Sequence, residues 1–139
     1  MPAVIARAAL APVLANPAAR AEQVTQLVLG ETATLLERNG DWRRVRTDAD
    51  DYDGWIHRGY LSEVEDPAAD AWRNQVNAWS EGAMVRIGGS ALPIPLRARL
   101  PLDRDVVCLP DGRQGRVVAG CIRELQESRS GARAKAPER

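Results

Sequence analysis

The sequence is poor in the residues that most enzymatic and metal sites use. Its 139 residues include one histidine, two cysteines and no phenylalanine, and 19 basic residues are balanced by 19 acidic ones. A chain without net charge has no global field that would draw it to nucleic acid or to anionic lipid. No run approaches the roughly 18 to 20 apolar residues that span a bilayer. We therefore expect neither a nucleic-acid partner nor a membrane partner.

The N-terminal stretch 3–15 is apolar, but Arg7 and Pro12 interrupt it. It also lacks the charged first region of a signal peptide. On the chain as given this indicates a cytoplasmic location. A chain from which a signal peptide had been removed would look the same, and it would belong to the cell envelope.

The two cysteines and the single histidine are too few for a metal site, because a structural zinc site needs four ligands. The sequence thus predicts no metal and no cofactor. Cys108 and Cys121 could form one disulfide, but two cysteines do not define a disulfide framework. Two reduced, buried thiols are the favoured interpretation.

A short pattern occurs twice, 61 positions apart, as GWIHRGYL at 54–61 and GRVVAGCI at 115–122. Each copy shows glycine, a bulky residue, a β-branched residue, two spacers, glycine, one further residue and an aliphatic. Each also follows an acidic turn, at 50–53 and at 111–114. A repeat of this kind indicates a duplicated small unit, closed by the same strand and turn.

Turn signals every 8 to 12 residues predict short antiparallel strands. In the first unit, 1–66, Asn39-Gly40 predicts a hairpin and 58–61 a single 3₁₀ turn. Pro67 suits the first turn of a helix, and an apolar stripe through 71, 72, 76 and 79 extends this helix over the linker 67–82. A second unit follows at 83–127, with a turn at Gly88-Gly89 and a hairpin through 106–118.

The residues from 128 to 139 are small and charged without apolar periodicity, which predicts a disordered tail. The fold class expected from the whole chain is all-β: two small SH3-like barrels joined by a short helix.

Three segments together resemble a known family: RAEQVTQL at 20–27, GDWRRV at 40–45 and DYDGWI at 51–56. They are similar to a bacterial SH3 (SH3b) domain, and more narrowly to the first SH3b domain of the NlpC-type cysteine endopeptidases that cut peptidoglycan peptides. The second unit, with LPDGR at 109–113, resembles the second SH3b domain of those enzymes. The resemblance covers roughly residues 4 to 125.

The resemblance implies a non-catalytic module that recognises or targets cell-wall peptides. Such a module is either a stand-alone protein or the N-terminal part of an NlpC-type peptidase. Glu22 would pair with the ammonium of a free L-alanyl end and Tyr52 would cover the peptide. The implied partners are a peptidoglycan-derived peptide or a cognate peptidase domain. The alternative is a scaffolding module that binds other proteins and no muropeptide.

Catalysis in that family needs a cysteine thiolate activated by histidine. Neither Cys108 nor Cys121 follows an aspartate and precedes a serine, as the nucleophile of that family does, and we expect no catalytic residue. The aspartates at 48–53 lack the glycine and the terminal glutamate of a calcium loop. In a chain without phenylalanine, we expect Trp42 and Trp55 to supply core volume.

Overall fold

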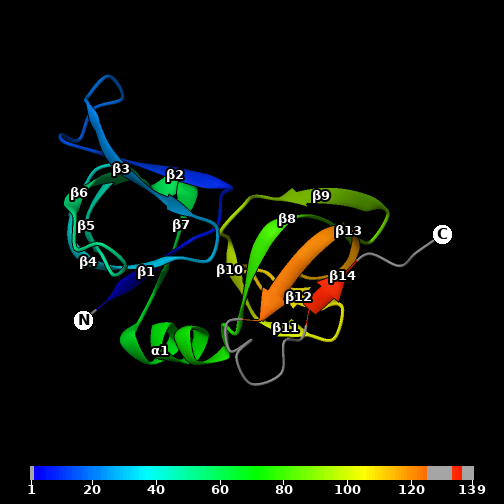
Figure 1. Cartoon of the computed structure of the whole chain (residues 1–139). Helices are drawn as coiled ribbons and strands as arrows, with labels where there is room; N and C mark the ends of the chain where they lie inside the picture. Colours follow the sequence, from blue (N-terminus) through cyan, green and yellow to red (C-terminus); the bar gives the residue numbers. More distant parts are fainter. Residues whose placement is uncertain (1, 125–132, 136–139) are drawn as a thin grey trace.

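The computed structural model describes residues 2–124 and 133–135. It is built from antiparallel strands and one α-helix, in two lobes (Figure 1). The expected all-β class with a short helix is confirmed.

The first lobe is a seven-stranded antiparallel sheet that curls on itself (Figure 1). Its strand order is β3-β2-β6-β5-β4-β1-β7. The strands are β1 (Ala3–Ala6), β2 (Leu10–Leu14), β3 (Gln23–Val28), β4 (Thr32–Asn39), β5 (Trp42–Thr47), β6 (Asp53–His57) and β7 (Leu61–Val64).

The turns of this lobe follow the sequence closely. Gly40, with a φ of +61°, lies in the two-residue connection of the β4–β5 hairpin, in which Asn39 pairs with Trp42. The 3₁₀ turn η1 (Arg58–Tyr60) connects β6 to β7. Nδ1 of His57 accepts a hydrogen bond from the amide of Gly59 at 3.0 Å and caps this turn. The single histidine therefore has a structural partner.

The second lobe is built on two long strands, β8 (Ala78–Ile87) and β13 (Gln114–Glu124). Its order is β10-β8-β13-β12-β11, with β9 paired to β8 and β14 paired to β13. The shorter strands are β9 (Ser90–Ile94), β10 (Arg99–Leu100), β11 (Leu102–Asp103), β12 (Val106–Cys108) and β14 (Arg133–Lys135). Gly88-Gly89 connects β8 to β9, and 109–113 connects β12 to β13, as the sequence predicts.

Helix α1 (Asp66–Gln75) begins with Pro67 in its first turn, as expected, but it is shorter than the predicted linker 67–82. Trp79 belongs to β8, where Ala78 and Ser80 are buried on either side of it. From Ala78 on, the alternating burial of a strand replaces the helical spacing that the sequence predicted for 79. The side-chain amide of Asn77 fixes the change, because its Nδ2 donates to the Leu102 carbonyl (2.9 Å) and its Oδ1 accepts from the Leu102 amide (2.7 Å).

A further expectation is corrected in the second lobe. The second copy of the repeat does not close with a 3₁₀ turn, because β13 continues through Gly120 with a register shift. Gly120 has a φ of +74° and approaches Gly82 of β8 so closely that a Cβ would lie 2.1 Å from the Gly82 carbonyl oxygen. Within the predicted disordered tail, Arg133–Lys135 forms β14, while 128–132 and 136–139 lie outside the described residues.

The apolar core consists of two aliphatic clusters that share strands. On β1, Val4 and Ala6 belong to the core of the first lobe, whereas Ile5 packs with the second lobe. On β3, Leu27 and Val28 divide in the same way. Because successive side chains of a strand point to opposite faces, β1 is buried from both sides, and so is the end of β3. The burial of β1 on both faces explains why the sequence begins its apolar N-terminal stretch at Ala3–Ala6.

Candidate functional site

The two lobes and helix α1 meet at the turn between β3 and β4. The indole Nε1 of Trp72 donates to the carbonyl of Gly30 at 2.8 Å, and the amide of Arg99 donates to the carbonyl of Leu29 at 2.9 Å. Gly30 has a φ of +89°, and a Cβ there would lie 1.7 Å from the carbonyl oxygen of Arg99. Only glycine lets β10 approach the first lobe this closely.

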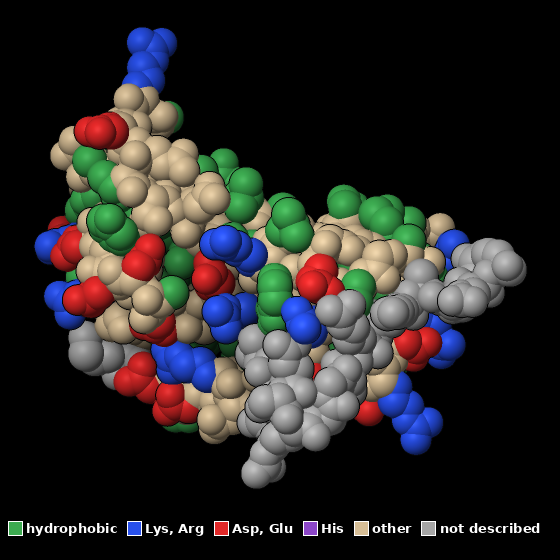
Figure 2. Space-filling view, viewed as in Figure 1, with side chains coloured by type: hydrophobic (Ala, Val, Ile, Leu, Met, Phe, Trp, Pro, Cys, Tyr) green, Lys and Arg blue, Asp and Glu red, His purple; other side chains and the backbone are tan. Residues whose placement is uncertain are grey.

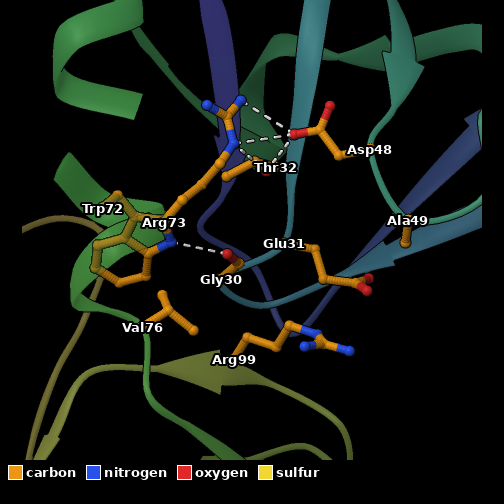
Figure 3. A pocket seen from close by; sticks show the side chains of 9 residues that line it. All are labelled: Gly30, Glu31, Thr32, Asp48, Ala49, Trp72, Arg73, Val76 and Arg99. Atoms are coloured by element: carbon orange, nitrogen blue, oxygen red, sulfur yellow. Dashed lines mark hydrogen bonds and ion pairs between the residues drawn. The ribbon is translucent and has the colours of Figure 1, made fainter. Parts of the chain in front are cut away.

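A cavity of about 420 Å³ opens beside this joint (Figure 3). On one side, Arg73 faces Asp48 and donates to its carboxylate from Nε at 3.2 Å and from Nη2 at 3.0 Å. Thr32 also donates its hydroxyl to Asp48. The charges on this side are therefore neutralised by partners on the protein. The lining residues are Gly30, Glu31, Thr32, Asp48, Ala49, Trp72, Arg73, Val76 and Arg99.

A second cavity, of about 610 Å³, lies against the first and shares Glu31, Ala49 and Arg99 with it. Together the two form one groove between the lobes, which we call the inter-lobe groove. Figure 2 shows basic and acidic side chains gathered in the hollow between the lobes. The second cavity is lined by Thr25, Gln26, Val28, Glu31, Ala49, Asp50, Trp79, Arg97 and Arg99.

The acidic loop 48–53 borders this groove, and protein groups bind each of its carboxylates. Asp50 accepts hydrogen bonds from the hydroxyls of Thr47 and Thr25, and Asp53 accepts two from Arg44, at 2.8 and 2.9 Å. Asp51 lies 3.7 Å from Nε of Arg46. In the part of the chain that the structure describes, no group of three His, Cys, Asp or Glu residues is placed to hold a metal ion.

The structure places both predicted site residues on the surface of the first lobe. Glu22 is exposed just before β3, and its carbonyl accepts from the amide of Ala15 at 2.8 Å. Tyr52 is 48% exposed, just before β6. Its backbone bonds twice to Thr47, through the amide to Oγ1 at 2.9 Å and through the carbonyl to the amide at 2.8 Å. Their joint role in ligand binding stays a prediction.

The expected core role of the tryptophans is wrong for Trp42 and Trp55. Both are half-buried, and the core of the first lobe is aliphatic. Trp42 instead packs edge-on against His57, with ring centroids 5.4 Å apart, and His57 packs against Tyr60 at 6.2 Å. These three rings border a cavity of about 350 Å³ beside Ala21.

Cys108 lies on β12 and Cys121 on β13, and no disulfide joins them. Burial raises the pKa of the Cys108 thiol, and the charge of Asp111 raises this pKa further. A raised pKa keeps a thiol protonated and unreactive at neutral pH. Cys108 thus has the opposite environment to that of a catalytic nucleophile. None of the described helices has the length and apolarity needed to cross a membrane.

Comparison with known proteins supports the resemblance found in the sequence. Residues 13–61, which run from β2 to the start of β7, match the family model of the bacterial dipeptidyl-peptidase SH3 domain. The resemblance of the first lobe to a bacterial SH3 domain is thereby confirmed. A search of curated proteins gave no significant match.

The fold is also similar to the crystal structure of an NlpC/P60 family protein from Bacillus cereus ATCC 10987, with a TM-score of 0.68 and 19% sequence identity. The similarity covers 83% of this chain, so it extends over both lobes, and 53% of that chain. This chain therefore spans about half the length of the solved protein. At this identity the similarity concerns the fold.

Proposed function

We propose that this protein is a non-catalytic module that recognises or targets peptidoglycan peptides, either alone or as the N-terminal part of an NlpC-type endopeptidase. The observation that carries the proposal is the match of residues 13–61 to the SH3 domain of bacterial dipeptidyl-peptidases. The shared fold with an NlpC/P60 family protein supports it over both lobes.

Within this proposal, Glu22 binds the ammonium of an L-alanyl end and Tyr52 lies across the peptide. Glu22 is accessible, and it has no ion-pair partner within residues 2–124. Tyr52 presents its ring from a backbone that two hydrogen bonds to Thr47 hold in place. A charge-assisted hydrogen bond contributes about 1.5 to 3 kcal/mol, so such a site alone gives a dissociation constant no tighter than about 1 mM.

The test is an NMR titration of the labelled protein with a peptide containing L-Ala-D-Glu, with its amine free or N-acetylated. The resonances of Glu22 and Tyr52 should shift only with the free amine, and Glu22→Gln should abolish that dependence. Glu65→Gln is the matched control, because Glu65 is also exposed and its side chain does not cap helix α1. Equal shifts with both peptides would remove the ammonium site.

The alternative is a protein-interaction or scaffolding module. Exposed apolar side chains favour it: Leu10 is 47% exposed and Leu96 is 63% exposed. Figure 2 also shows hydrophobic side chains on the surface in view. Exposed apolar patches mark interaction surfaces when they are large and contiguous. The same titration separates the two functions: absence of any peptide-dependent shift at saturating concentration would leave the scaffolding function ahead.

A further inference from the structure

Two arginines on one wall of the inter-lobe groove have no charged partner among residues 2–124. Arg97 and Arg99 are both exposed and flank Ala98, which is fully buried. Both line the cavity of about 610 Å³. Neither guanidinium forms an ion pair or a hydrogen bond with any residue of the segment 2–124. Arg73, in the same groove, is by contrast paired with Asp48 and Asp70.

The backbone holds Arg97 in a conformation that its own residue type disfavours. Its φ is +71°, in the left-handed region where glycine is the residue of lowest cost. The segment is fixed there by Ser80, whose carbonyl accepts from the Arg97 amide at 2.8 Å and whose amide donates to the Ala98 carbonyl at 2.9 Å. Strain of this kind gathers at ligand sites, where it positions a side chain in advance. At 97, it places a guanidinium on the cavity wall.

The cavity also contains two carboxylates, Glu31 and Asp50, which already accept hydrogen bonds. Glu31 accepts from the Val28 amide at 2.7 Å. Two cations and two anions give the cavity no net charge, which disfavours a dianion such as phosphate. A ligand that carries both a carboxylate and an ammonium matches both signs. The volume lies in the range of about 300 to 1,000 Å³ that is typical of small-ligand sites.

We propose that the second cavity of the inter-lobe groove binds a carboxylate of an acidic, zwitterionic peptide, with Arg97 and Arg99 as its cationic contacts. The guanidinium fork suits this partner because it can donate two parallel hydrogen bonds to one carboxylate. The inference rests on the proposed function for the class of peptide. It concerns a different site from that of Glu22 and Tyr52, because neither residue lines this cavity.

The test compares two arginine variants with the same backbone change. Arg97→Gly removes a charge from the cavity and relieves a positive φ. Arg104→Gly also removes one charge and relieves a positive φ, of +61°, but Arg104 lies in the loop between β11 and β12, away from this cavity. Three probes are titrated into the full chain: the dipeptide L-Ala-D-Glu, the dicarboxamide of this dipeptide, and inorganic phosphate. Binding is followed through the side-chain resonances of Arg99 and Trp79.

We expect the dipeptide to shift the Arg99 and Trp79 resonances and the dicarboxamide to leave them unchanged. Arg97→Gly should weaken this binding about tenfold, the loss expected for one charge-assisted contact, while Arg104→Gly should not weaken it. Arg99→Gln should weaken it to a similar extent.

The failures of the two proposals differ. Shifts at Glu22 and Tyr52 without shifts at Arg99 and Trp79 would keep the proposed function and overturn this inference. Shifts at Arg99 and Trp79 alone would support this inference and overturn the ammonium site. Equal weakening by Arg97→Gly and Arg104→Gly, or tighter binding of phosphate than of dipeptide, would also overturn it.

Discussion

Gly30→Ala tests whether the joint between the two lobes depends on the absence of a side chain. The substitution adds a single methyl group at a position where the backbone has a φ of +89°. That methyl carbon would lie 1.7 Å from the carbonyl oxygen of Arg99 and 2.8 Å from its carbonyl carbon. Both neighbours are backbone atoms of β10, so no side-chain rotation can make room.

Two terms contribute to the expected loss of stability. Alanine in left-handed backbone costs about 1–2 kcal/mol. The displacement of β10 adds about 1–3 kcal/mol, the usual cost of overpacking. Together they lower the free energy of unfolding by roughly 2–5 kcal/mol. Gly112→Ala supplies the matched control, because Gly112 has a φ of +92° and a Cβ there would meet nothing within 4 Å.

Urea titration of the wild type and both variants, followed by circular dichroism, gives the two losses of stability. Gly112→Ala should show only the backbone term, and Gly30→Ala should show both terms. Amide exchange should also rise at Arg99, whose amide bonds to Leu29 across the joint. The reasoning fails if the two variants lose the same stability to within about 0.5 kcal/mol, the limit set by such measurements.

Two further predictions concern charge and folding units. Burial raises the pKa of Glu63, but hydrogen bonds from Arg43 and Arg38 outweigh it and hold the pKa below its ordinary value. Glu63→Gln should therefore reduce stability by up to about 1 kcal/mol at pH 7, and urea titrations should show the difference shrinking as pH falls through that lowered pKa. We also propose that 1–66 folds alone, because the whole aliphatic cluster of the first lobe lies within it, whereas 67–139 lacks the partners Ile5, Val28 and Leu29 and should give an unfolded NMR spectrum.

Local chemistry made the turns predictable from the sequence. Gly40 supplies the positive φ that a tight hairpin needs, and Gly88 supplies another of +60° between β8 and β9. Pro67 suits the first turn of α1 because it has no amide to leave unpaired. Each of these features depends on residues that are neighbours along the chain.

The inter-lobe groove could not be predicted in this way, because its residues come from distant segments. Glu31 follows β3, Arg97 precedes β10 and Trp79 lies on β8. Only the packing at Gly30 brings them to one cavity. A weak signal was present, since Arg97 and Arg99 alternate about a small apolar residue after two prolines. The helix end was missed because the Asn77 amide, whose partner Leu102 is 25 positions away, decides it.

The core role of the tryptophans failed for a related reason. The interior of the first lobe is filled by aliphatic residues, and each of its seven strands contributes at least one of them. Trp42 and Trp55 lie on β5 and β6, where half-burial leaves one part of each ring to the surface. The composition indicates that the core needs large side chains, but the curvature of the sheet decides whether a tryptophan on a given strand faces the core or the surface.

The repeated pattern acquires a physical meaning from its first glycine. A Cβ at Gly54 would lie 2.5 Å from Cγ1 of Val13, and a Cβ at Gly115 would lie 2.9 Å from Cγ1 of Ile87. Neither glycine has a positive φ, so the requirement at both is close packing against the neighbouring strand of the sheet, β2 beside β6 and β8 beside β13. The two copies thus share a close packing contact that a side chain at this glycine would force to shift, whereas the turn that follows it differs between the two lobes.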